Sequence, residues 1–108
     1  MKVAITSTGN SPESKLDSRF GRCSYFAIYN TEKKILEEFL LNPNKESEGG
    51  AGPASAQFIA SKGVEKVVSG EFGGKVKSIF ESLQIETLIF NEPDKTIAGI
   101  TDFLNKKN

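Results

Sequence analysis

The feature that most constrains the fold is an alternation of helix and strand patterns in the second half of the chain. Between residues 53 and 104, three segments with apolar residues at helical spacing alternate with two short apolar runs, 66–69 and 86–90. Such short runs are typical of buried strands. Strands that are joined through a helix pack in parallel, by right-handed crossovers. This half of the chain therefore predicts an α/β fold.

The first half supplies three further strands. Residues 2–7 are apolar or small on both faces, which predicts a central strand. Residues 24–30 and 35–41 are strand-like and lie on either side of a short polar turn, so they predict a hairpin. Glu37 and Glu38 place the second hairpin strand at an edge of the sheet, where charge blocks unwanted pairing.

These patterns together predict one α/β domain over residues 1–108. The sheet is mixed and five-stranded, with strand order 3-2-1-4-5, and helices flank it. Two helix starts carry recognisable signals. Pro53 suits the first helical position because its missing N–H is not needed there. Asp94 is an N-cap type of residue ahead of the last helix.

Composition excludes several classes of function. Basic and acidic residues are equal at 14 each, so no charge excess indicates a nucleic-acid partner. The apolar runs are too short to span a membrane. The chain has no His and one cysteine, Cys23, so a His-based catalytic triad and an internal disulfide are both excluded. The single cysteine also fits a reducing cytoplasm.

A candidate site follows from the topology. Open α/β sheets bind ligands beyond the carboxyl ends of parallel strands, near a switch in strand order. Three segments should meet there, namely residues 8–23, 49–53 and 70–74. The last two are Gly-rich helix starts whose free N–H groups attract anions. The first carries Arg19 and Arg22, so we expect a pocket for a multiply charged anion.

Each of these features also has a purely structural interpretation. Arg19 and Arg22 could be solvated loop charges, with Arg22 paired to Asp17. Cys23 could be a small buried hydrophobe. If the arginines lie near it, its thiolate would be favoured and could bind a metal. The Gly-rich run 49–52 could be a simple connector into the next helix.

Three motifs resemble those of the dinitrogenase iron–molybdenum cofactor biosynthesis family. They are DSRFGRCSYF at residues 17–26, GGAGP at 49–53 and VSGEFG at 68–73, in the family's order and spacing. The resemblance covers essentially the whole chain. The family includes NifX-like carriers and the C-terminal domain of NifB-like proteins. Its fold is similar to the ribonuclease H-like α/β motif, which agrees with the strand order predicted above.

The resemblance implies binding or carrying of an iron–sulfur or molybdenum-containing cluster rather than catalysis, with cluster-assembly proteins as partners. We expect no obligatorily bound cofactor, no nucleic-acid or membrane partner, and a monomer or weak homodimer. The implied metal ligand is Cys23. The cofactor-binding residues expected here are Arg19, Phe20, Gly21, Arg22, Cys23, Gly49, Gly50, Gly52, Gly70 and Gly73.

Two other classes of function stay open on the sequence alone. An enzyme acting on a small phosphorylated or carboxylated ligand would need Glu48, Glu71 or Asp17 as its general base, since the chain has no His. A protein-interaction module would instead pair through its edge strand or its Cys23 region.

Overall fold

The computed structural model describes residues 1–92 and 94–106. The predicted domain's last two residues and position 93 lie outside this part of the chain. The strands are β1 (Lys2–Ser7), β2 (Tyr25–Asn30), β3 (Ile35–Leu41), β4 (Lys66–Ser69) and β5 (Glu86–Ile89). The helices are α1 (Ala51–Ala60), α2 (Gly74–Ser82) and α3 (Ile97–Lys106).

The strands form one mixed sheet in the order β3-β2-β1-β4-β5, which confirms the predicted order. Strand β1 pairs antiparallel with β2 on one side and parallel with β4 on the other. Strand β3 is an edge strand, as its two glutamates predicted. From β1, the chain continues into β2 and β3 on one side of the sheet, whereas β4 and β5 lie on the other side of β1. This is the switch in strand order at which ligands gather in sheets of this kind.

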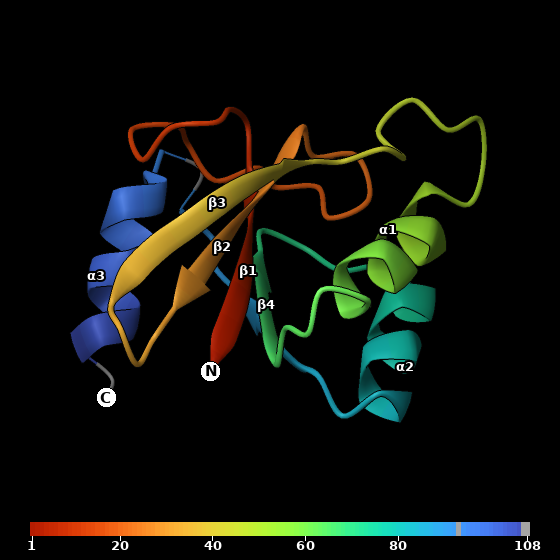
Figure 1. Cartoon of the computed structure of the whole chain (residues 1–108). Helices are drawn as coiled ribbons and strands as arrows, with labels where there is room; N and C mark the ends of the chain where they lie inside the picture. The colour runs from red at the N-terminus through yellow and green to blue at the C-terminus, as the bar shows by residue number, and fades with distance from the viewer. Residues whose placement is uncertain (93, 107–108) are drawn as a thin grey trace.

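Helices cover both faces of the sheet, with α1 and α2 on one side and α3 on the other (Figure 1). Successive residues of a strand face opposite sides, so each strand contributes to two cores. In β1, Ala4 belongs to the core beneath α1 and α2, whereas Val3 and Ile5 belong to the core beneath α3. The first of these two cores lies directly under the predicted site.

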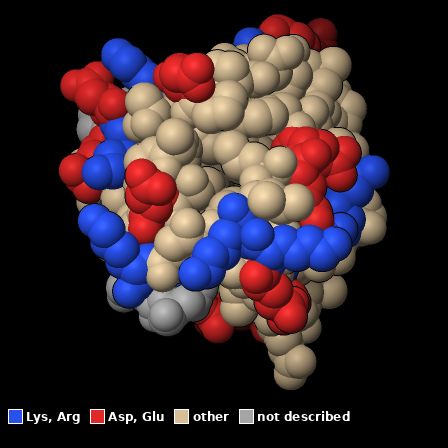
Figure 2. All heavy atoms as spheres, turned by 60° about the vertical axis from the view of Figure 1, so that its left-hand side comes forward, with Lys and Arg blue, Asp and Glu red and all other residues tan. Residues whose placement is uncertain are grey.

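The surface on the α3 side carries basic and acidic side chains next to one another (Figure 2). This mixture agrees with the zero formal net charge of the chain. None of the helices formed by the described residues is long and apolar enough to cross a lipid bilayer.

Helix α1 begins two residues earlier than predicted. Its N-cap is Gly50, whose φ of 68° lies in the left-handed region that favours glycine. Pro53 is therefore the third helical residue and not the first. The position costs nothing, because the first N–H groups of a helix have no partner within the helix.

The predicted cap of α3 was wrong. The Oγ1 atom of Thr96 accepts a hydrogen bond from the Gly99 N–H at 3.1 Å, so Thr96 caps this helix. Asp94 instead forms an exposed ion pair with Lys15 at 3.3 Å. Both residues are of the capping type, but the loop after β1 fixes the start of α3. The Ile97 N–H donates to the Ser14 carbonyl at 2.9 Å.

Candidate functional site

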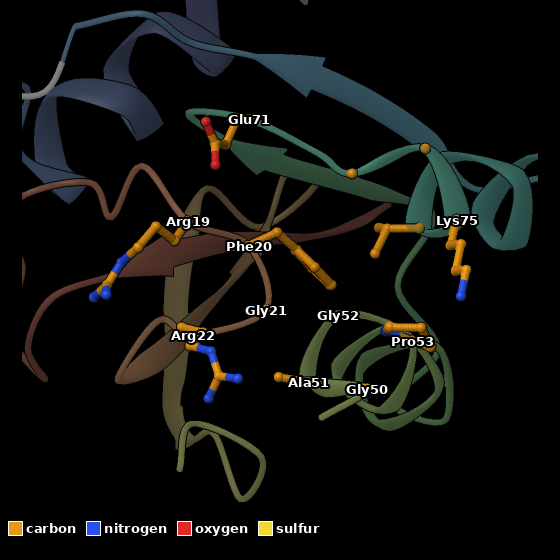
Figure 3. Close-up of a pocket in the computed structure, with 13 residues that line it drawn as sticks. Arg19, Phe20, Gly21, Arg22, Gly50, Ala51, Gly52, Pro53, Glu71 and Lys75 are labelled. Atoms are coloured by element: carbon orange, nitrogen blue, oxygen red, sulfur yellow. The ribbon is translucent and has the colours of Figure 1, made fainter. Parts of the chain in front are cut away.

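A pocket of about 600 Å³ lies at the carboxyl ends of β1 and β4 (Figure 3). Its walls come from the three segments that the topology predicted to meet, namely the loop after β1, the start of α1 and the segment from β4 into α2. The lining residues are Arg19, Phe20, Gly21, Arg22, Gly50, Ala51, Gly52, Pro53, Glu71, Gly73, Gly74, Lys75 and Val76.

Two helices open into this pocket with uncapped amino ends. The N-cap residues are Gly50 for α1 and Gly73 for α2, and neither helix has a side-chain cap or an acidic residue in its first turn. In the first turns of these two helices, the N–H groups of five lining residues donate to no acceptor in the part of the chain that the structure describes. They belong to Ala51, Gly52, Gly74, Lys75 and Val76. These donors and the positive ends of both helix dipoles favour an anion.

Close backbone contacts hold the walls of the pocket together. A Cβ atom added at Gly21 would lie 2.8 Å from both the N and the Cα atoms of Gly52 in α1. A Cβ atom added at Gly70 would lie 2.5 Å from the Cα atom of Ser18. Both positions therefore require glycine, because backbone atoms cannot move aside as a flexible side chain can.

Arg19 lies at one edge of the pocket and extends away from α1 and α2 (Figure 3). The buried carboxylate of Asp17 orients it, accepting from the Arg19 backbone N–H at 2.9 Å and from its Nε atom at 3.4 Å. The proposed pairing of Asp17 with Arg22 was therefore wrong. The Arg19 side chain is 57% exposed, so its guanidinium is screened by water unless a ligand covers it.

Arg22 is half-buried and not a freely solvated charge. Its Nη1 atom donates to the carbonyls of Lys45 at 2.9 Å and Ser47 at 2.7 Å. These bonds tie the loop between β3 and α1 to the edge of the pocket. The Nε and Nη2 atoms of Arg22 donate to no acceptor within the described residues, so this guanidinium keeps donors for a ligand.

Cys23 lies in the hydrophobic core and does not line the pocket. Its thiol is fully buried and donates to the Phe20 carbonyl at 3.3 Å. Burial raises the pKa of Cys23 to about 12, and the negative charge of Asp17 adds to this rise. The expectation that the arginines favour its thiolate was therefore wrong, because desolvation dominates.

The structure does not support Cys23 as a metal ligand in this conformation. A buried, protonated thiol is a poor ligand, since metals bind the thiolate. Among the described residues, no group of three or more His, Cys, Asp or Glu side chains could hold a metal ion.

The sequence model of the dinitrogenase iron–molybdenum cofactor family matches residues 1–106. The chain belongs to this family. An uncharacterized protein of Methanocaldococcus jannaschii is 32% identical over 88 residues, which cover 80% of this chain and 71% of that protein. The family expectation drawn from the three motifs is thus confirmed.

Solved structures show the same fold. The apo form of the orange protein from Desulfovibrio gigas superposes with a TM-score of 0.86 at 23% identity, covering 98% of this chain and 88% of that one. A putative NifB protein from Thermotoga superposes with a TM-score of 0.79 at 28% identity, covering 97% and 87%. These likenesses support the α/β architecture on which the pocket is built.

Most of the predicted cofactor-binding residues line the pocket, but three do not. Cys23 is in the core, Gly49 is exposed outside the lining, and Gly70 borders a smaller hollow of about 200 Å³ on the other side of Glu71. The Phe20 ring is almost fully buried and packs against the ring of Phe80 at 5.3 Å, so it forms a floor.

Lys75 was not among the predicted site residues, yet it gives the pocket a third basic side chain beside its one carboxylate, Glu71. A usable signal was present, because Lys75 directly follows Gly73 and Gly74 and so had to fall in the first turn of α2. Of the candidate general bases, only Glu71 lines the pocket. Asp17 is buried against Arg19.

Proposed function

We propose that this protein binds and carries an anionic iron–sulfur or iron–molybdenum-type cluster in the pocket, without catalysing a reaction on it. One observation carries the proposal most directly. The amino ends of α1 and α2 open, uncapped, on the same pocket, and three basic side chains stand around it. Membership of the dinitrogenase iron–molybdenum cofactor family indicates the class of anion.

The chemistry of the walls suits a cluster as cargo. Sulfide and oxide ligands on a metal cluster accept hydrogen bonds, and N–H groups near such sulfur atoms stabilise the reduced, more negative state. The five free N–H groups can make such bonds without a covalent link to the metal. A volume of about 600 Å³ lies within the range of small-molecule sites.

Cargo held in this way can be exchanged. No thiolate or imidazole lines the pocket, so no metal–sulfur or metal–imidazole bond to the protein has to break when the cluster leaves. The carrier role therefore needs partners that supply and accept the cluster, and cluster-assembly proteins in a reducing cytoplasm would meet that need. Such a role requires only binding and release of the cluster, without a reaction on it.

Anaerobic reconstitution tests the proposal. The protein is incubated with ferrous iron, sulfide and molybdate, desalted, and measured for visible absorption and bound metal. We expect a band in the wild type that persists in Cys23→Ala and is strongly reduced in Lys75→Ala. The matched control is Lys77→Ala, because Lys77 is an exposed lysine of the same helix outside the pocket lining.

Two outcomes would overturn this function. One is a wild-type protein that retains no cluster under these conditions. The other is a band that disappears in a folded Cys23→Ala variant, because the cluster would then depend on a thiolate that the pocket does not contain. Equal losses in Lys75→Ala and Lys77→Ala would show only a general charge effect, and would count against the pocket.

A further inference from the structure

A buried polar network lies behind the wall of the pocket. Asn42, which follows β3 and is 3% exposed, donates from Nδ2 to the carbonyls of Gly21 at 3.2 Å and Cys23 at 3.0 Å. Ser55 in α1 is fully buried and donates from Oγ to the same Gly21 carbonyl at 3.1 Å. The Asn42 Oδ1 atom lies 3.3 Å from the same hydroxyl.

Asn42, which follows β3, and Ser55 and Gly52, both in α1, together hold the Gly21 peptide in place. The Gly21 carbonyl is bonded by both polar side chains, and its Cα faces the backbone of Gly52 too closely for a side chain. A buried hydroxyl and a buried amide are costly unless they are hydrogen-bonded, so apolar residues would fill this space at lower cost. What polar residues add is a fixed position for the Gly21 peptide.

Gly21 connects this network to the ligand-facing groups. It directly precedes Arg22 in the chain and touches Gly52 at the open end of α1. Asn42 also begins the loop that Arg22 holds, since its Oδ1 atom accepts from the Asn44 N–H at 3.0 Å. A shift of the Gly21 peptide would therefore move a guanidinium and a helix start relative to each other.

We propose that Asn42 and Ser55 are positioning residues for anion binding, which act by fixing the Gly21 peptide between the Arg22 loop and the start of α1. The proposal rests on the proposed function of the pocket as an anion site. Displacements of about 1 Å are enough to weaken a site built from several convergent groups. Neither residue touches the ligand, so their replacement weakens binding without removing any ligand contact.

The first arm of the test measures molybdate affinity by calorimetry in Ser55→Ala, Asn42→Ala and the double variant. We expect each single variant to bind about tenfold more weakly, because the displaced groups converge less well on the ligand. The double variant should lose less than the product of the two single losses, since both side chains bond the same carbonyl. The control is Ile100→Val, which loosens the core under α3 on the opposite face and should bind as the wild type does.

The second arm needs no ligand and uses the single cysteine as a reporter. Cys23 is fully buried directly behind the network, so native-state alkylation by iodoacetamide requires the structure around the network to open. We expect alkylation about tenfold faster in Ser55→Ala than in the wild type or Ile100→Val. Ser55→Ala is the milder replacement and keeps the test available if Asn42→Ala does not fold.

The two arms separate the failure of each proposal. A wild-type protein that binds no molybdate contradicts the anion site, and the alkylation rates then decide alone whether the network holds the loop. If Ser55→Ala is alkylated at the wild-type rate, or binds molybdate with wild-type affinity, the positioning role is wrong.

Discussion

The first backbone N–H groups of α3 differ from those of α1 and α2 in whether the protein supplies their hydrogen-bond acceptors. At the start of α3, the chain itself takes up the backbone donors. The N–H groups of Ile97 and Ala98 donate to the carbonyls of Ser14 and Pro12, and that of Gly99 donates to the Thr96 hydroxyl. At the starts of α1 and α2, the corresponding donors have no partner among the described residues and face the pocket.

This difference separates a structural helix start from a functional one. Unpaired N–H groups cost free energy unless water or a ligand takes them up. Helix α3 is capped by the side chain of Thr96, whereas the N-cap residues of the two pocket-facing helices are Gly50 and Gly73, which have no side chain to cap with. Glycine leaves the donors accessible and lets a ligand approach the backbone.

The largest expected effect comes from giving α2 a cap like that of α3. Gly73 has φ −70° and ψ 159°, a normal N-cap conformation, and a Cβ atom added there meets nothing within 4 Å. Gly73→Asp should therefore fold, cap α2 and place a carboxylate in the pocket. We expect molybdate affinity to fall about 100-fold, or about 3 kcal/mol, because like charges meet in a partly buried site. Calorimetry measures the loss.

The matched control is Gly73→Asn, which caps the helix with a neutral group of the same shape. It should raise the melting temperature slightly, as Gly73→Asp does, and weaken molybdate binding much less. An equal loss of affinity in both variants would assign the effect to the volume of the side chain. Unchanged affinity in Gly73→Asp would mean that the end of α2 takes no part in binding.

The sequence was sufficient for the sheet and for the place of the pocket, because both follow from local patterns. Alternating helix and strand patterns determined the strand order, and the Gly-rich runs at 49–53 and 70–74 marked the two open helix starts. The cap of α3 was not predictable in the same way. Asp94 and Thr96 are both capping residues, and the choice depends on carbonyls of a distant loop.

The roles of residues that depend on burial could not be predicted from the sequence. Cys23 follows Arg22 in the chain, which suggested an activated thiolate, but its side chain faces a core that also includes residues of α1, β4 and α2. Asn42 and Ser55 are polar residues of types that usually face water. Only the packing of β3, α1 and the Gly21 loop buries them together.

A smaller effect tests whether Cys23 belongs to the core or to the open end of α1. Its pKa rises from 9.0 to about 12 in the folded protein, so the folded state holds the thiol proton more tightly than the unfolded state. This contribution is complete below pH 9 and is lost as the pH rises toward 12. Between pH 8 and 10, the wild type should lose about 1.4 kcal/mol more unfolding free energy than Cys23→Ala.

Urea denaturation of both proteins at the two pH values measures this difference, and the comparison cancels every pH effect that the two proteins share. A thiolate favoured by Arg19 and Arg22 would instead have a lowered pKa, and the wild type would then gain unfolding free energy relative to Cys23→Ala between pH 8 and 10. That result would make Cys23 a candidate metal ligand again.

The smallest effect is expected from removing the side-chain cap of α3. Thr96→Ala removes the cap of Gly99, so we expect about 1 kcal/mol less unfolding free energy, while Thr96→Ser, which keeps the hydroxyl, should remain near the wild type. Molybdate affinity should not change in either variant, because the remaining N–H groups of α3 are bonded to the loop after β1 on the opposite face of the sheet. Weaker binding in Thr96→Ala would contradict the distinction between the two kinds of helix start. It would mean that the cap of α3 helps to shape the pocket through that loop, which carries Arg19 and Arg22 at its other end.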